Sequence, residues 1–110
     1  MTHHPITIGT NSIDVMDQLV CPCCGGPNLH HGDVAVYHRH QEDAQVNVTV
    51  VSGREISTTS DVTVSRNPSS RRDGITIAME CEECNSKLLL GISQHKGSTY
   101  FTWHHIECEL

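Results

Sequence analysis

Two pairs of cysteines have the spacing of metal ligands. They lie in Cys21-Pro22-Cys23-Cys24-Gly25 and in Cys81-Glu82-Glu83-Cys84-Asn85. Each is a C-x2-C arrangement, which lets two thiolates bind one tetrahedral zinc ion from a tight turn. Gly25 and Asn85 each follow a second thiol, and both residue types tolerate the left-handed backbone that such a turn needs. The sequence therefore predicts one structural zinc ion bound by Cys21, Cys24, Cys81 and Cys84.

The alternative is that these cysteines form disulfides or remain free thiols. The adjacent Cys23 and Cys24 suit a disulfide framework poorly. The first five residues do not place a basic region before an apolar one, as a signal peptide would. No apolar run approaches the roughly 18 residues that a membrane span requires. These features favour a reducing cytoplasm, and hence zinc over disulfides.

Composition points to one small domain with a thin core. The chain has 110 residues, of which 36% are hydrophobic and 4% aromatic. A core of this size commonly needs an additional staple, and structural zinc would supply it. The formal net charge is −6, and four thiolates with one Zn²⁺ would bring it to about −8. Such an acidic chain is poorly suited to generic phosphate binding, which depends on Lys and Arg.

Apolar and polar residues alternate after the first cysteine pair, as is typical of strands. The pattern predicts strands near 33–39 and 45–51, a short one at Val62 and Val64, and another over Ile75, Ile77 and Met79. Residues 65–74 are rich in turn formers and are expected to form a loop.

The last hairpin has the clearest register. A two-residue turn at Lys96-Gly97 places Ile92 opposite Phe101 and Leu90 opposite Trp103, on one apolar face. A slip of one residue would separate these side chains onto opposite faces. Trp103 is therefore assigned to the core, and Tyr100 to the other, exposed face.

The predicted fold is mainly β. It is a zinc ribbon with antiparallel β-hairpins and an elaborated hairpin insertion between the two cysteine turns, or knuckles. Residues 1–20 form an N-terminal arm, with a short strand at Ile6-Thr7-Ile8 and a short helix over about 12–19 that Ser12 caps. Residues 21–107 form the zinc-ribbon domain, in which 52–73 is a flap-like insertion.

The stretch from Cys21 to Trp103 resembles a set of uncharacterised small proteins of actinobacterial phages and prophages. Besides the cysteine pairs, the matching segments are Gly25-Gly26, Leu29-His30-His31-Gly32, Asn67-Pro68-Ser69-Ser70-Arg71-Arg72, Gly74-Ile75 and Gln94-His95-Lys96-Gly97. Many unrelated ribbons share the cysteine pattern, whereas the Asn-Pro-Ser-Ser-Arg-Arg and Gln-His-Lys-Gly segments are more specific. The resemblance implies a phage origin and a zinc-ribbon fold, and it implies no activity.

The remaining cysteines have no obvious partner in the sequence. Cys23 is expected to face solvent; exchange with Cys24 as a ligand and a reactive thiol are the alternatives. Cys108 is expected to be a spare thiol in a flexible C-terminal tail.

The histidines come mostly in pairs, and His30-His31 is expected to lie near the zinc or to pack on the sheet. The alternative is a second metal site drawing on His38, His40, His104 or Cys108. Paired histidines also occur in HNH nucleases, but no helical stretch follows them here to complete a ββα site. Four protein ligands would leave zinc no open position for water, so an enzyme is not expected.

The leading functional hypothesis is a small cytoplasmic zinc ribbon that acts as a binding or adaptor module for a host or phage protein. Arg66, Arg71 and Arg72 are the candidate partner-binding residues; the alternative is that the arginines of this loop pair with Asp61 and Asp73. The alternative function is nucleic-acid binding through Arg54, Arg66, Arg71 and Arg72.

Overall fold

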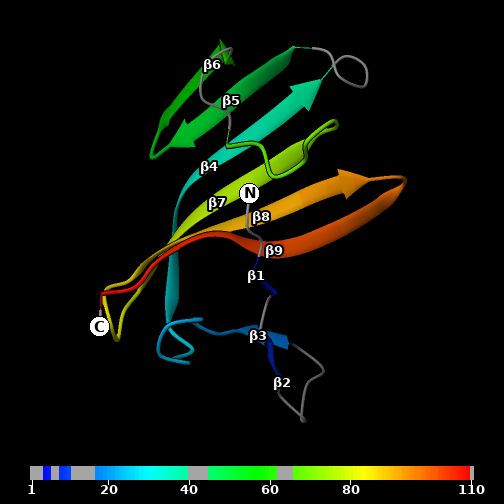
Figure 1. Ribbon diagram of the computed structural model, residues 1–110. Coiled ribbons are helices and arrows are strands. Elements are labelled where there is room, and N and C mark those ends of the chain that lie inside the picture. The colour runs from blue at the N-terminus through cyan, green and yellow to red at the C-terminus, as the bar shows by residue number, and fades with distance from the viewer. Residues whose placement is uncertain (1–3, 6–7, 11–16, 40–44, 62–65, 110) are drawn as a thin grey trace.

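The computed structural model describes residues 4–5, 8–10, 17–39, 45–61 and 66–109 (Figure 1). Within these ranges the chain contains strands and no helix. The strands are β1 (His4–Pro5), β2 (Ile8–Thr10), β3 (Asp17–Leu19), β4 (Leu29–Arg39), β5 (Val46–Ser52), β6 (Glu55–Asp61), β7 (Gly74–Cys81), β8 (Lys87–His95) and β9 (Ser98–Glu107). In the described residues, therefore, no helix could span a membrane.

Seven strands form one antiparallel sheet in the order β1-β9-β8-β7-β4-β5-β6, and β2 and β3 form a separate ribbon (Figure 1). The prediction of a mainly β, antiparallel fold is confirmed. Strands β4, β5 and β7 cover the expected strand regions. The short strand expected at Val62 and Val64 lies outside the described residues.

The predicted N-terminal helix over 12–19 is wrong at its C-terminal end. Asp17–Leu19 forms β3, whose residues pair with Ile8–Thr10 of β2. The backbone groups of this segment therefore bond across two strands. Residues 11–16, and Ile6 and Thr7 of the expected strand, lie outside the described residues.

The register predicted for the last hairpin is confirmed. Leu90 pairs with Trp103 and Ile92 pairs with Phe101, around a turn in which Lys96 and Gly97 have positive φ. Trp103 is fully buried and Tyr100 is exposed, as expected. Phe101 shares the face of Trp103, but it is 57% exposed and is not part of the buried cluster that contains Trp103.

The two faces of the seven-stranded sheet have different coverings. We call the side that carries Cys81, Leu88, Leu90 and Trp103 the knuckle face; these residues and Cys21 form one buried cluster, against which Leu19 packs. We call the opposite side the loop face. There Tyr37, Val46 and Val48 form a second buried cluster.

Residues 66–73 fold back onto the loop face, where Asn67, Pro68 and Ser69 are buried. Ser69 donates its hydroxyl to the Gln94 carbonyl at 2.9 Å, and its N–H donates to Asn67 Oδ1 at 3.0 Å. Asp73 accepts the backbone N–H of Arg39 at 2.9 Å. The segment is thus held against the sheet by its own polar side chains.

Two strand glycines make room for this segment. A Cβ on Gly91 would lie 3.1 Å from the Cβ of Pro68, and one on Gly74 would collide with Asn67 Oδ1 and lie 2.8 Å from Pro68 Cδ. Glycine in a strand often marks such a close approach of another part of the backbone. The glycines at the start of β7 and in the middle of β8 therefore leave room for Asn67 and Pro68.

We expect Gly74→Ala to lower the free energy of unfolding by about 2 kcal/mol, as overpacking of a tight site does. The added methyl would push Asn67 away and break its bond to the Ser69 N–H. Chemical denaturation measures the loss. Gly32→Ala is the matched control, because its Cβ would meet only ordinary contacts, 3.8 Å from the Ala78 carbonyl. Equal stability of the two variants would mean that Asn67 and Pro68 leave room for a side chain at position 74.

Candidate metal centre

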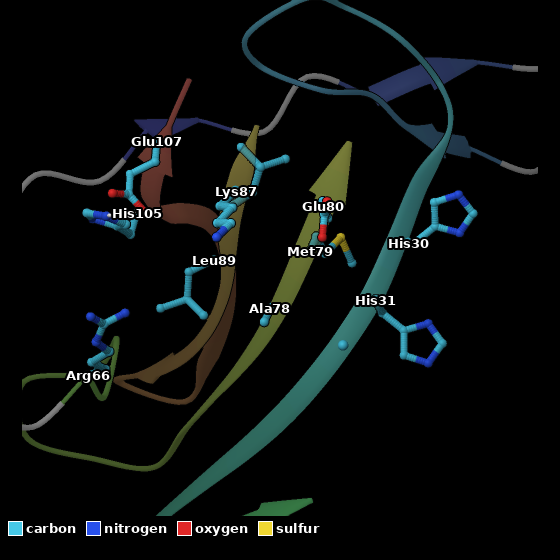
Figure 2. Close-up of a pocket in the computed structure, with 12 residues that line it drawn as sticks. His30, His31, Arg66, Ala78, Met79, Glu80, Lys87, Leu89, His105 and Glu107 are labelled. Carbon is cyan, nitrogen blue, oxygen red and sulfur yellow. Dashed lines mark ion pairs between the residues drawn. The ribbon is translucent and has the colours of Figure 1, made fainter. Parts of the chain in front are cut away.

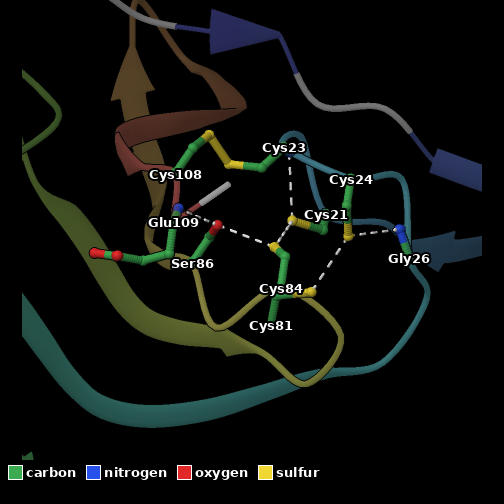
Figure 3. Close-up of a disulfide and its surroundings, with 9 residues drawn as sticks. All are labelled: Cys21, Cys23, Cys24, Gly26, Cys81, Cys84, Ser86, Cys108 and Glu109. Carbon is green, nitrogen blue, oxygen red and sulfur yellow. Dashed lines mark hydrogen bonds between the residues drawn. A yellow bond between two sulfur atoms is a disulfide. The ribbon is translucent and has the colours of Figure 1, made fainter.

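The first cysteine turn lies between β3 and β4, and the second joins β7 to β8 (Figure 3). Each turn closes on itself: the N–H of Gly25 donates to the Cys21 carbonyl at 2.8 Å, and that of Asn85 donates to the Cys81 carbonyl at 2.9 Å. Gly25 has φ 79° and Asn85 has φ 59°. Both residues therefore adopt the left-handed conformation that the sequence predicted for them.

The structure brings together all four predicted ligands. The sulfur atoms of Cys21, Cys24, Cys81 and Cys84 all lie within 4.8 Å of one another. Cys21 Sγ is 3.8 Å from Cys84 Sγ, and Cys24 Sγ is 3.6 Å from Cys81 Sγ. A tetrahedron of thiolates around a zinc-sized ion, with bonds of about 2.3 Å, requires separations of about 3.8 Å. Two of the six sulfur–sulfur separations match this value and all lie within 4.8 Å, so the four side chains are close enough to share one metal ion.

Backbone N–H groups and a hydroxyl surround the sulfurs. The N–H of Cys23 donates to Cys21 Sγ at 3.3 Å, and that of Gly26 donates to Cys24 Sγ at 3.4 Å. Ser86 Oγ lies 3.0 Å from Cys84 Sγ. Donors of this kind orient metal ligands and stabilise thiolate charge.

Burial and hydrogen bonding shift the pKa values of the cysteine thiols in opposite directions. Burial raises the pKa of the Cys81 thiol to about 12, although backbone N–H groups of Cys84 and Glu83 favour the thiolate. The hydrogen bond with Ser86 lowers the pKa of Cys84 to about 7. A buried thiolate such as that of Cys81 needs a positive charge beside it, and a bound cation supplies one.

The two knuckles also bond directly to each other. Asn28 donates from Nδ2 to Glu83 Oε1 at 2.6 Å, and this bond holds the pKa of Glu83 below its usual value. The N–H of Glu82 donates to the Asn28 carbonyl at 3.0 Å. Gly26 leaves room for the carboxylate, since a Cβ there would lie 2.7 Å from Glu83 Oε2.

The expectation that Cys23 faces solvent and Cys108 is a spare thiol in a flexible tail is wrong. The two form a disulfide across 85 residues of sequence, with their Cα atoms 5.7 Å apart. Strand β9 pairs with β8 as far as Glu107, opposite Lys87. This pairing carries Cys108 to the knuckles (Figure 3).

Among the described residues, the histidines do not assemble into the alternative second metal site; His40 lies outside these residues. Figure 2 shows His30 and His31 on β4 and His105 on β9, on the two sides of β7 and β8. His30 Nε2 lies 3.5 Å from Glu82 Oε2, beside the second knuckle. Among the described residues, the four cysteines are the only group of three or more His, Cys, Asp or Glu side chains placed to share a metal ion.

A hollow of about 380 Å³ lies on the loop face between these histidines (Figure 2). Ala78 and Leu89 contribute apolar surface to it, and Arg66 and Lys87 stand with Glu80 among its charged residues. Opposite charges are therefore mixed along its lining.

The candidate arginines are divided between two parts of the molecule. Arg54 lies in the turn between β5 and β6, at the outer edge of the sheet. Arg66, Arg71 and Arg72 are exposed in the segment that folds over the loop face. Asp73 contacts His38 Nδ1 at 3.1 Å in addition to the Arg39 N–H.

The fold and the site define a small antiparallel β protein with a candidate four-cysteine metal centre. Comparison with protein-family models, with curated proteins and with solved structures finds no significant match to this chain.

Proposed function

We propose that the four-cysteine site binds one zinc ion and that this zinc is structural. Four clustered thiol donors, two pairs of them at separations that suit a tetrahedral site, favour zinc, which prefers sulfur ligands and four-coordination in structural sites. Four protein ligands leave no open position for a water or a substrate. The ion joins the start of β4 to the β7–β8 turn and so supports the buried cluster of the knuckle face.

We further propose that the chain is a binding module of phage type whose partner is a phage or bacterial host protein in the cytoplasm. The observation that carries this proposal is an apolar row across the knuckle face. Phe101, Ile92, Ile75 and Val36 are cross-strand neighbours in β9, β8, β7 and β4. Phe101 is 57% exposed and Val36 41% exposed.

The next row extends the same surface to the outer strands. Val34 pairs with Val51, and Val51 with Ile56, which is 71% exposed. Four of the five exposed large apolar side chains of the described residues thus lie on the knuckle face; the fifth, Tyr100, lies on the loop face. A contiguous exposed apolar patch on a soluble domain commonly marks a protein interface.

The partner that this surface fits is a protein with a flat apolar patch. A hollow of about 330 Å³ beside Val36, Ile75 and Ile92 is also lined by Asp73 and Gln94, so it would take a side chain with both apolar and polar atoms. The acidic net charge favours a protein over a nucleic-acid backbone.

The test is to capture partners from host lysate with the zinc-loaded chain and with Phe101→Lys. Phe101 is the most exposed residue of the row that runs from β9 to β4, and a charge placed there is expected to weaken binding by about tenfold or more. Tyr100→Lys is the matched control, because it changes the neighbouring residue on the opposite face. A captured protein that binds wild type and Tyr100→Lys but not Phe101→Lys supports the proposal, whereas equal loss in both variants contradicts it.

The wild-type chain and a triple arginine variant test the nucleic-acid alternative. Binding to nucleic acid that falls with salt, and that is lost when Arg66, Arg71 and Arg72 are all replaced by Ala, would assign function to the loop face instead. The exposure of these three arginines is the observation that keeps this alternative.

A further inference from the structure

The Cys23–Cys108 disulfide lies at the metal centre and is open to solvent. Cys108 is exposed and Cys23 is half-buried, whereas Cys21 and Cys81 are fully buried. A reductant in solution can therefore reach this pair more readily than it can reach the two buried ligands.

The disulfide joins the C-terminal segment to the first knuckle. Cys23 lies between Cys21 and Cys24, and its own N–H donates to Cys21 Sγ at 3.3 Å. A movement of Cys23 would therefore disturb the hydrogen bond that its N–H donates to Cys21 Sγ, a candidate metal ligand. The covalent link to Cys108 restricts that movement.

A second link joins the same segment to the other knuckle. The N–H of Glu109 donates to Ser86 Oγ at 2.9 Å, and Ser86 Oγ lies 3.0 Å from Cys84 Sγ (Figure 3). Residues 107–109 therefore bridge the two knuckles, through a covalent bond on one side and a hydrogen-bonded hydroxyl on the other.

We propose that Cys23 and Cys108 form a reversible redox site that controls how fast the centre releases its metal. The reaction partner is a dithiol. One of its thiolates attacks a sulfur of the disulfide, forms a mixed disulfide and expels the other cysteine as a thiolate. The second thiol of the reductant then displaces the remaining cysteine, so that two electrons reach the protein and the reductant becomes a disulfide. The oxidised reductant drives the reverse reaction.

The consequence is a centre with a closed and an open form. In the oxidised form the C-terminal segment is held across both knuckles; in the reduced form only the Glu109 hydrogen bond and the β9 pairing hold it. Intracellular disulfides are usually transient, so in the proposed cytoplasm the open form is the resting state and oxidation closes it. The inference uses the proposed zinc site but not the proposed partner.

The experiment compares zinc transfer from the full chain to a chromogenic chelator, after oxidation and after reduction with a phosphine. The reduced protein is expected to release zinc about tenfold faster, the size of effect seen when groups around metal ligands are altered. Cys108→Ser and Cys23→Ser are both expected to release zinc at the reduced rate under either condition. Oxidised protein that releases zinc as fast as reduced protein, or faster, overturns the proposal.

Peptide mapping of the oxidised protein is the second measurement, and it requires no metal. It is expected to recover Cys23 linked to Cys108. Oxidised protein in which these two cysteines remain unlinked overturns the redox site, even if the zinc proposal stands. Correct linkage in a folded chain that binds no zinc would overturn the metal role while leaving the reversible disulfide itself established.

Discussion

Replacement of Cys81 by serine is expected to abolish metal binding and to unfold the domain. Cys81 is fully buried and belongs to the same cluster as Leu88, Leu90 and Trp103. Structural zinc contributes about 10–16 kcal/mol of apparent binding free energy in small zinc domains, whereas a domain of this size has only about 5–15 kcal/mol of net stability. If the loss of Cys81 abolishes metal binding, the free energy removed is comparable to the whole net stability, and the domain is expected to unfold.

Elemental analysis should find one zinc ion per wild-type chain and none in Cys81→Ser. The single tryptophan, Trp103, packs in the same cluster as Cys21 and Cys81, so its fluorescence should shift toward that of a solvated indole. Cys108→Ser, measured in reduced protein, is the matched control and should keep both its zinc and its fluorescence. If the two serine variants behaved alike, the assignment of Cys81 as a ligand would be wrong.

The four-cysteine cluster could be predicted from the sequence because most of the residues that define it lie close together in each turn. Each knuckle needs two thiols at fixed spacing and one residue that tolerates positive φ, and Gly25 and Asn85 supply it. Only the contact between the two turns depends on residues that are far apart in the sequence. Strand β7 runs beside β4 and into the second turn, so the sheet itself brings Cys81 to the end of β4 that follows the first turn.

The disulfide could not be predicted in this way, because no local pattern pairs residues 85 positions apart. A signal did exist in the last hairpin, whose register was predicted correctly around its turn. Continued back to the start of β8, that register carries β9 to the second knuckle. A bulge between Leu89 and Leu90 shifts the pairing by one residue, so that Lys87 meets Glu107 and Cys108 follows beside the knuckles.

Composition predicts a loop over residues 65–74, but it does not predict where the described part, residues 66–73, packs on the sheet. Turn-forming residues show that a segment leaves the strands, and they do not show where it then packs. The informative residues lie elsewhere in the chain. Gly74 and Gly91 stand within strands, where glycine is unfavourable unless another group approaches closely.

Trp103→Ala is expected to lower the free energy of unfolding by about 3–5 kcal/mol, the usual cost of removing a fully buried aromatic side chain. Phe101→Ala, two residues earlier on the same face, should cost about 1 kcal/mol or less, because that side chain is already 57% exposed. Denaturant unfolding followed by circular dichroism, with zinc present, measures both losses.

The difference between the two variants tests how the knuckle face is covered. Alternation along β9 places Phe101 and Trp103 on one face, but only Trp103 lies beneath the knuckles with Cys21 and Cys81. Trp103→Phe should cost less than Trp103→Ala, because the indole Nε1 has no hydrogen-bond partner among the described residues and no bond is lost. Comparable losses in Phe101→Ala and Trp103→Ala would mean that Phe101 is also covered, and the row from Phe101 to Val36 would then lose its most exposed residue.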